Sequence, residues 1–192
     1  QEYHATLTMP EGALQAGNNY TYTVKVNATG LTLEGCTIGS WVDGGGESGE
    51  AEDLGYIYDS NTKTYTVYNA NGLMNIAELV NGGKSDINIT LDTDIDLTGK
   101  DWTPIGTDYD NSYKGTFDGG GHTITGLTFT TNDEYAGLFG WLNRAGTVKN
   151  VVMEGVQITS NQIYGGSIGG VVGYSWGTIE NCSVSGSVSG TV

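Results

Sequence analysis

Apolar and polar side chains alternate near the start of the chain. Between residues 20 and 26, tyrosine and valine occupy every second position, and threonine or lysine occupies the positions between them. This period of two is typical of a β-strand with one buried face. Turn-forming residues flank the segment, and residues 31–33 and 36–38 are interpreted as its return strand. The pattern predicts a small antiparallel β segment over residues 1–42.

The alternation stops at residues 43–53, which contain no large apolar side chain. Such a segment buries too little surface to offset the entropy lost on ordering, so it is interpreted as a Gly/Glu-rich linker. Its three consecutive glycines do not predict a phosphate-binding loop, because no Gly-Lys-Ser/Thr follows them. A second domain is therefore expected over residues 54–192.

A short helix is predicted after a strand at residues 64–68. The apolar residues with helical spacing are Leu73, Ile76, Ala77 and Val80. Asn71 is the expected N-cap, and Gly82 is expected to stop the helix. A second strand is predicted at residues 87–91.

An internal repeat dominates the rest of the chain. Three segments, residues 123–129, 147–153 and 178–184, align without gaps at offsets of 24 and 31 residues. Gly-Leu-Phe-Gly at 137–140 precedes the second copy, and Gly-Val-Val-Gly at 170–173 precedes the third. One copy is too small to bury its own apolar face, so the copies are expected to stack.

Each position of the repeat keeps its chemistry from copy to copy. The predicted inward columns are Ile124, Val148 and Ile179; Leu127, Val151 and Cys182; and Phe129, Met153 and Val184. Between the first two columns lies a corner of Gly126, Asn150 and Asn181, residue types that tolerate a left-handed backbone. Asparagines stacked there are able to hydrogen-bond one another. These features predict an all-β fold: a right-handed parallel β-helix of about three or more rungs with one short capping helix. A β-sandwich with similar hairpins is the alternative.

The Gly-Leu-Phe-Gly and Gly-Val-Val-Gly units, each followed by Gly-Thr-Val/Ile-x-Asn-Val/Cys, resemble the GLUG repeat of bacterial surface proteins. Residues 94–99, 102–106 and 115–124 resemble the lead-in that accompanies such repeats, so the resemblance covers residues 56–192. It implies a β-helix on a secreted or surface protein. GLUG-type repeats also occur in larger secreted proteins, including some immunoglobulin-cleaving peptidases. The chain is expected to be a portion of a longer precursor.

Residues 14–22 together with Ile38-Gly39-Ser40-Trp41 resemble the last strands of a fimbrillin-type domain. Such domains belong to pilus and adhesin proteins of Gram-negative gut and oral anaerobes. The resemblance implies cell adhesion or association with fimbriae. It also implies an extracellular location at the bacterial cell surface or outer membrane.

The charge narrows the choice of partner. The chain has 22 acidic and 7 basic residues, a net charge of −15, and its lysines and arginine are scattered singly. Nucleic acids and anionic membranes are therefore not expected partners. Cys36 and Cys182 are interpreted as small buried apolar residues, with a disulfide as the alternative.

Residues suited to catalysis are few. His4 and His122 are the only histidines, and no serine lies in a nucleophile-elbow pattern. Three alternating carboxylates are weak candidates for a structural Ca²⁺ site, or else form an exposed acidic edge: Asp92, Asp94 and Asp96. A polysaccharide-cleaving β-helix would also need a basic group beside them, and Lys100 is the nearest. We therefore expect no enzyme, no cofactor and no metal.

Aromatic side chains near the connections between repeats are the candidate ligand-binding residues: Trp141, Tyr164, Tyr174 and Trp176. Sugar rings and protein partners both bind such platforms. The alternative is that these rings cover the ends or sides of the coil. The expected function is that of a non-catalytic adhesion or fimbria-associated protein, with the β-helix as a rigid display or binding module.

A glycan-binding module for polysaccharide capture is the second hypothesis, and a polysaccharide-cleaving enzyme is the third. The expected partners are surface glycans or proteins of the host or of bacteria. The open last turn of the coil also predicts self-association through its exposed edge.

Overall fold

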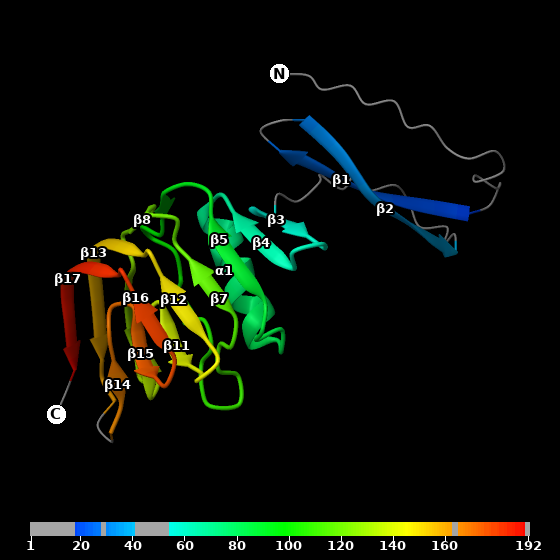
Figure 1. Cartoon of the computed structure of the whole chain (residues 1–192). Helices are drawn as coiled ribbons and strands as arrows, with labels where there is room; N and C mark the ends of the chain where they lie inside the picture. The colour runs from blue at the N-terminus through cyan, green and yellow to red at the C-terminus, as the bar shows by residue number, and fades with distance from the viewer. Residues whose placement is uncertain (1–17, 28–29, 41–53, 163–164, 191–192) are drawn as a thin grey trace. The chain divides into compact units, whose positions relative to one another are not determined.

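The computed structural model describes residues 18–27, 30–40, 54–162 and 165–190. The chain divides into two units between residues 52 and 53. In the first unit, β1 (Asn18–Asn27) and β2 (Gly30–Ser40) pair antiparallel (Figure 1). The predicted antiparallel segment is therefore confirmed, whereas the predicted linker lies outside the described residues.

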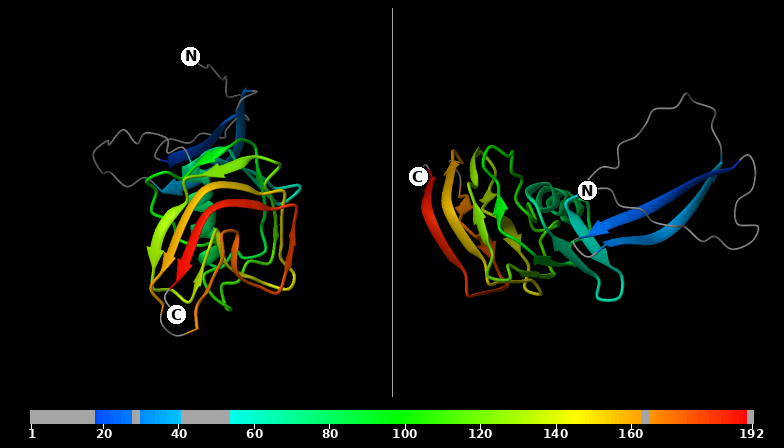
Figure 2. Two further views of the ribbon diagram at one scale, coloured as in Figure 1. Left: turned by 90° about the vertical axis from the view of Figure 1, so that its left-hand side faces the viewer. Right: turned by 90° about the horizontal axis from the view of Figure 1, so that it is seen from above.

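The second unit is a coil of short strands. Its strands are β3 (Tyr56–Asp59), β4 (Thr64–Val67), β5 (Asn88–Leu91), β6 (Ile95–Asp96), β7 (Thr116–Asp118), β8 (Thr123–Thr125), β9 (Thr128–Thr131), β10 (Tyr135–Ala136), β11 (Phe139–Leu142), β12 (Thr147–Lys149), β13 (Val152–Ser160), β14 (Ser167–Ile168), β15 (Val172–Ser175), β16 (Thr178–Glu180) and β17 (Ser183–Gly190). Figure 2 shows successive turns of this coil lying one on another.

The strands of successive turns form four sheets. The first has the order β16-β12-β7-β5-β4-β3, and the second has the order β17-β13-β8-β6 with β9 also paired to β13. The other two are the pairs β11-β15 and β10-β14. Within this described unit β3 pairs antiparallel with β4, and the remaining strand pairs are parallel. The predicted parallel β-helix is confirmed, with about three turns.

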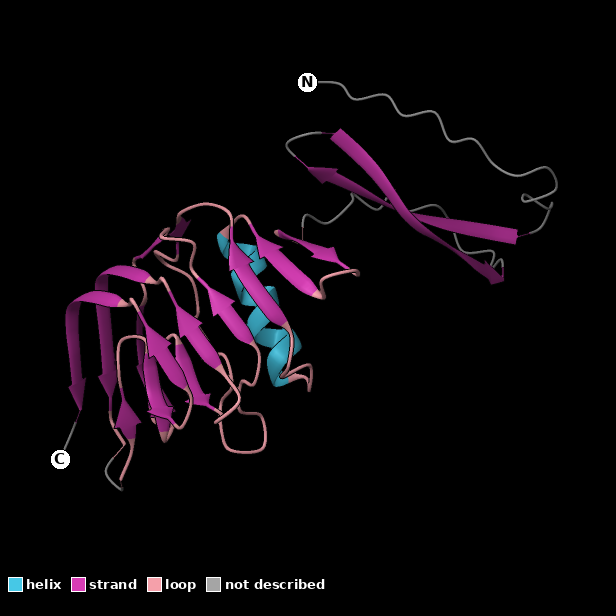
Figure 3. Ribbon diagram, viewed as in Figure 1, coloured by secondary structure: helices cyan, strands magenta, loops and turns pink. Residues whose placement is uncertain are grey.

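The helix of the described residues is α1 (Ala70–Asn81), shown in cyan in Figure 3. Its N-cap is Asn69 and not the predicted Asn71, because the Asn69 backbone is extended and its side chain accepts a hydrogen bond from Gly72 N at 2.8 Å. The predicted apolar face is confirmed: it packs into the same core as the strands through Leu73, Ile76, Ala77 and Val80.

The register of the second and third repeat copies is confirmed. Val148 of β12 pairs with Ile179 of β16, and Met153 of β13 pairs with Val184 of β17. The side chains of Val148 and Met153 are buried. A constant inward position in each turn therefore produces a continuous apolar column.

The register of the first copy was predicted wrongly. The residue beneath Val148 is Phe117 of β7, and Ile124 of β8 lies beneath Met153. Ile124 follows Phe117 by seven positions, whereas Met153 follows Val148 by five. Two extra residues in the corner of the lower turn shift the register, and a gapless alignment could not accommodate them.

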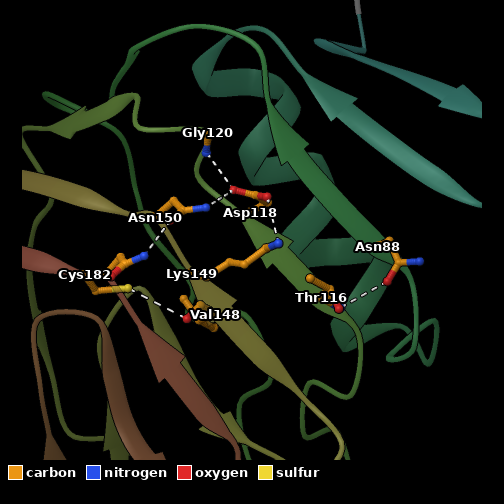
Figure 4. A network of polar contacts seen from close by, with 9 residues as sticks. Asn88, Thr116, Asp118, Gly120, Val148, Lys149, Asn150 and Cys182 are labelled. Atoms are coloured by element: carbon orange, nitrogen blue, oxygen red, sulfur yellow. Dashed lines mark hydrogen bonds and ion pairs between the residues drawn. The ribbon is translucent and has the colours of Figure 1, made fainter.

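A ladder of polar side chains runs up this corner (Figure 4). Asn150 and Asn181 have left-handed φ values of 55° and 50°. Asn181 Nδ2 donates to Asn150 Oδ1 at 3.3 Å, and Asn150 Nδ2 donates to Asp118 Oδ1 at 2.9 Å. The predicted bond between stacked asparagines is thus present. Gly126 does not belong to this corner, because its backbone N–H bonds to Glu154 O instead.

Asp118 anchors the lower end of the ladder. Its carboxylate accepts a further bond from Gly120 N at 3.0 Å and lies 3.1 Å from Lys149 Nζ. Burial acts to raise the pKa of Asp118, but the hydrogen bonds from Asn150 and Gly120 and the nearby Lys149 outweigh it and lower that pKa. The ionised carboxylate is therefore the form that the ladder holds.

The glycines of the repeat motif allow the backbones of neighbouring segments to approach closely. A Cβ atom on Gly140 would lie 2.5 Å from Gly106 O, and one on Gly173 would lie 2.8 Å from Ala136 N. No side chain fits at either distance without a backbone shift. The two motif copies therefore hold glycine for steric reasons.

Candidate aromatic binding site

Two of the three predicted acidic residues, Asp94 and Asp96, accept hydrogen bonds from backbone N–H groups. Asp94 Oδ1 accepts a hydrogen bond from Thr123 N at 2.8 Å, and Asp96 Oδ1 accepts one from Thr98 N at 2.9 Å. Both side chains are exposed, as is that of Asp92. In the part of the chain that the structure describes, no group of three or more His, Cys, Asp or Glu side chains could hold a metal ion.

The other candidates for chemistry are dispersed. His122 Nδ1 lies 3.5 Å from Asp94 Oδ1 in an exposed turn, and Lys100 Nζ donates to Asn71 Oδ1 at 3.3 Å. His4 lies outside the described residues. Cys182 is a partly buried free thiol whose Sγ donates to Glu180 O at 3.1 Å. These contacts assemble no pairing of a nucleophile with a general base.

Three of the four predicted aromatic residues lie together. Trp141 of β11 and Tyr174 of β15 occupy paired positions on neighbouring turns, and their ring centroids are 4.3 Å apart. Trp176 follows β15 in the chain, and its ring lies 5.6 Å from Trp141 and 6.0 Å from Tyr174. The parallel pairing of β11 with β15 brings these rings together although 33 residues separate the first two. The fourth, Tyr164, lies outside the described residues.

Two further tyrosines complete the group, and the sequence reasoning missed both. The Tyr135 ring of β10 lies 4.6 Å from Trp141 and 5.7 Å from Tyr174. The Tyr109 ring lies 5.7 Å from Trp141 and 6.0 Å from Trp176. We call the five residues Tyr109, Tyr135, Trp141, Tyr174 and Trp176 the aromatic cluster. A signal for Tyr135 was its position just before the Gly-Leu-Phe-Gly motif, but no repeat position marks Tyr109.

A loop that leaves the coil wall carries Tyr109. Trp141 N donates to Gly106 O at 2.6 Å, and Tyr113 N donates to Trp141 O at 3.0 Å. The backbone therefore bonds to β11 at Gly106 and again at Tyr113, and residues 107–112 form a loop between these two points. These two bonds fix both ends of the loop, and the Tyr109 ring within it lies 5.7 Å from the Trp141 ring.

Internal hydrogen bonds hold this loop. Asp108 Oδ1 accepts from Asn111 N at 2.9 Å, and Ser112 Oγ donates to Tyr109 O at 2.8 Å. The hydrogen bonds from Asn111 lower the pKa of Asp108, so its carboxylate stays ionised. The loop is thus preorganised, which reduces the entropy lost when a ligand binds.

The cluster has a buried base and an exposed face. Trp141 is 8% exposed, and its Nε1 is buried without a hydrogen-bond partner among the described residues. Tyr109 and Trp176 are 58% and 51% exposed. Although Trp141 is buried, it is not part of the apolar core inside the coil. Trp141 lies in β11, one residue before the end of that strand, and thus next to the connection that follows.

Other polar atoms of the cluster, unlike Trp141 Nε1, form hydrogen bonds with near neighbours. Trp176 Nε1 donates to Tyr174 Oη at 3.2 Å, and Tyr135 Oη donates to Glu134 Oε1. The hydrogen bond to Glu134 is the main reason why the pKa of Tyr135 rises to about 12. The phenol therefore remains a neutral hydrogen-bond donor at physiological pH. Flat rings with hydroxyl and indole groups can pack against apolar faces of a ligand and hydrogen-bond to its polar groups.

Comparisons with known proteins agree with the repeat. Residues 164–189 match the GLUG motif, so the chain contains the predicted repeat. It is 30% identical over 152 residues to halomucin from Haloquadratum walsbyi, covering 73% of this chain and 2% of halomucin. It is 33% identical over 147 residues to a "Putative Gly-rich membrane protein" from Evansella cellulosilytica, covering 71% of this chain and 16% of that protein.

A solved structure shares the architecture. The crystal structure titled "a putative immunoglobulin A1 protease" from Bacteroides ovatus matches with a TM-score of 0.55 and 26% identity. The match covers 66% of this chain and 39% of that one. The chain thus spans well under half the length of each of these three proteins. None of the described helices is long and apolar enough to cross a membrane.

Proposed function

We propose that this chain is part of a non-catalytic cell-surface protein, in which the GLUG-containing β-helix displays the aromatic cluster as a binding site. The observation that carries the proposal is the gathering of five rings on the outside of the coil, with Tyr109 and Trp176 exposed. The names of halomucin and of the Gly-rich membrane protein support a surface location.

Cell adhesion is the role that we assign to this display. The adhesin and fimbria-associated reading rests on the fimbrillin-like pattern at residues 14–22 and 38–41, which the antiparallel pairing of β1 with β2 supports. The same fimbrillin-like pattern is the basis on which we propose a Gram-negative source and an outer-membrane location. A net charge of −15 keeps such a protein soluble outside the cell.

The ligand that fits the cluster is a neutral or amino-substituted glycan. Sugar rings present apolar C–H faces that pack on indole and phenol rings, and their hydroxyls bond to groups such as Tyr174 Oη. The loop that bears Tyr109 also bears Asp108 and Asp110, and Glu134 adjoins Tyr135. These carboxylates would repel sulfated or uronic acid polymers.

The test is binding of the chain to an array of neutral, amino and acidic glycans, followed by calorimetry on each hit. We expect Trp176→Ala to weaken binding by about 10-fold or more, since an exposed aromatic contact at a binding site contributes at least about 1–2 kcal/mol. Trp176→Phe should retain most of the affinity. Thr130→Ala, an exposed change on β9, is the matched control.

Four outcomes would overturn the proposal. Binding that persists in Trp176→Ala would place the site elsewhere, and a blank array would remove glycan binding from this chain. A preference for acidic glycans would contradict the electrostatic argument. Cleavage of a bound glycan, or of immunoglobulin A1, by the purified chain would contradict the non-catalytic assignment.

A further inference from the structure

One turn of the coil crosses part of the wall with fewer residues than the turn above it. Ile95 of β6 lies beneath Ile124 of β8, and Ile105 forms a parallel bridge with Phe139 of β11. Ile105 follows Ile95 by ten positions, whereas Phe139 follows Ile124 by fifteen. The lower turn is therefore five residues shorter between these two points, and β9 of the upper turn is four residues long. The wall thus lacks a segment of about one strand between two neighbouring turns.

The shorter turn leaves one edge of β9 without a partner strand. Among the described residues, β9 pairs with β13 alone, and Thr131 O accepts a hydrogen bond from Asn161 N on that side. Backbone groups of successive strand residues point to opposite edges, so the N–H and C=O groups of Thr128 and Thr130 point to the other edge. The sequence of β9, Thr-Phe-Thr-Thr, has none of the charged residues or prolines that usually protect an open edge.

A groove lies beside this open edge. Its volume is about 320 Å³, and its lining comes from residues 100–104 of the shorter turn and from β9 and Asp133 of the turn above. The apolar part of the lining includes Trp102, which is 7% exposed, and Phe129, which packs against the core. Trp102 Nε1 donates to Gly137 O at 3.2 Å, which fixes the indole. A free strand edge next to an apolar surface is the combination that β-strand addition uses.

The charged residues of the groove favour a basic ligand. Asp101 and Asp133 line the groove, and both are exposed. Lys100 also lines it, but its Nζ donates to Asn71 Oδ1 at 3.3 Å. The whole chain carries a net charge of −15. A lysine or arginine of a ligand would therefore be attracted to this groove, and an acidic segment would be repelled.

We propose that the groove binds an extended, basic segment of a partner protein, which adds a strand to the free edge of β9. The N–H and C=O groups of Thr128 and Thr130 would pair with the backbone of that segment. Side chains on one face of the added strand would contact Trp102 and Phe129, and a basic side chain would lie near Asp133. A glycan fits this edge less well, because sugars do not supply the regular backbone donors and acceptors of a strand.

The test is hydrogen exchange and calorimetry of the whole chain with a synthetic peptide of alternating threonine and valine that has a lysine at each end. At saturation, the amides of Thr128 and Thr130 should exchange at least about 10-fold more slowly, because they would then be hydrogen-bonded. The same peptide N-methylated at two adjacent amides, one on each of its edges, should bind at least about 10-fold more weakly. Glutamate in place of both lysines should weaken binding by about 3-fold or more.

Two variants of the chain test the same contacts. Thr128→Pro removes one N–H that faces the groove, at the first residue of the strand, where proline is tolerated, and should weaken binding by about 10-fold or more. Asp133→Lys should weaken binding of the lysine peptide by about 3-fold or more. Glu180→Lys makes the same charge change on β16, in another sheet, and should alter the affinity by less than about 2-fold. Circular dichroism and the melting temperature of each variant report whether it folds.

The proposal fails if the N-methylated peptide binds as tightly as the parent peptide, or if the Thr128 and Thr130 amides stay unprotected at saturation. It also fails if no binding is detected at millimolar peptide. Glycan binding that is lost in Asp133→Lys would assign the groove to sugars and would overturn the proposal as well. The aromatic cluster is tested with glycans and the groove with peptides, so the failure of one site is distinguishable from the failure of the other.

Discussion

At the scale of the residue, absent side chains matter as much as those that pack. Gly140 and Gly173 hold corresponding positions in the two motif copies, and each lies where a Cβ would meet backbone atoms. Backbone cannot move aside as the end of a flexible side chain can. The motif glycines therefore set how closely neighbouring segments approach. Trp141 follows Gly140 in β11, so its position depends on this close approach.

Gly140→Ala tests this steric requirement. We expect it to lower the free energy of unfolding by about 2 kcal/mol or more, because its Cβ would lie 2.5 Å from Gly106 O. Gly190→Ala is the matched control, since its only neighbour closer than 3.5 Å is Ile168 Cδ1, and its effect should stay within about 0.5 kcal/mol. Urea unfolding of both variants measures the difference. Equal effects would show that close backbone approach is not what the motif requires.

At the scale of the element, hydrogen bonds in the polar corner fix the register between successive turns. Apolar columns alone are non-directional and would fix that register less strongly. Asp118, Asn150 and Asn181 come from three successive turns and are bonded in sequence. The left-handed φ of each asparagine lets the chain turn sharply between two strands. Corner conformation and the bond between turns therefore depend on the same residue type.

Variants of Asn150 separate these two roles. Asn150→Gly keeps the left-handed corner but removes the bonds to Asp118 and Asn181, and we expect a loss of about 1–2 kcal/mol in unfolding free energy. Asn150→Ala removes the bonds and also strains a φ of 55°, so it should cost about 1 kcal/mol more than Asn150→Gly. Thermal and urea unfolding of the pair measure the difference. If alanine were tolerated as well as glycine, the strain argument would fail.

At the scale of the whole molecule, burial varies along the coil. The columns are closed in the turns that contain β7, β8, β12 and β13, and they are open in the turn that contains β16 and β17. Each turn gains stability from its neighbours, so a turn with one neighbour is less stable than a turn with two. The coil is therefore expected to open from its last turn.

Hydrogen exchange of the chain tests this gradient. We expect amides of β17 to exchange at least about 10-fold faster than those of β13, because opening free energy follows local burial. Uniform protection along the coil would contradict the gradient.

The sequence by itself determined the coil. Apolar and polar positions are set residue by residue, so two repeat copies were enough to predict the inward columns, the asparagine corner and their parallel stacking. The helix face at Leu73 and Val80 was predictable for the same reason, although its N-cap was misplaced by two residues.

Only the tertiary structure decided the register of the first turn and the composition of the site. The two extra corner residues before Ile124 are absent from the other copies, so pattern alone could not detect them. Tyr109 meets Trp141 because a loop bulges between backbone bonds on either side of it. Periodicity fixes which way a side chain points along one strand, whereas contacts between rings depend on how separate turns stack in space.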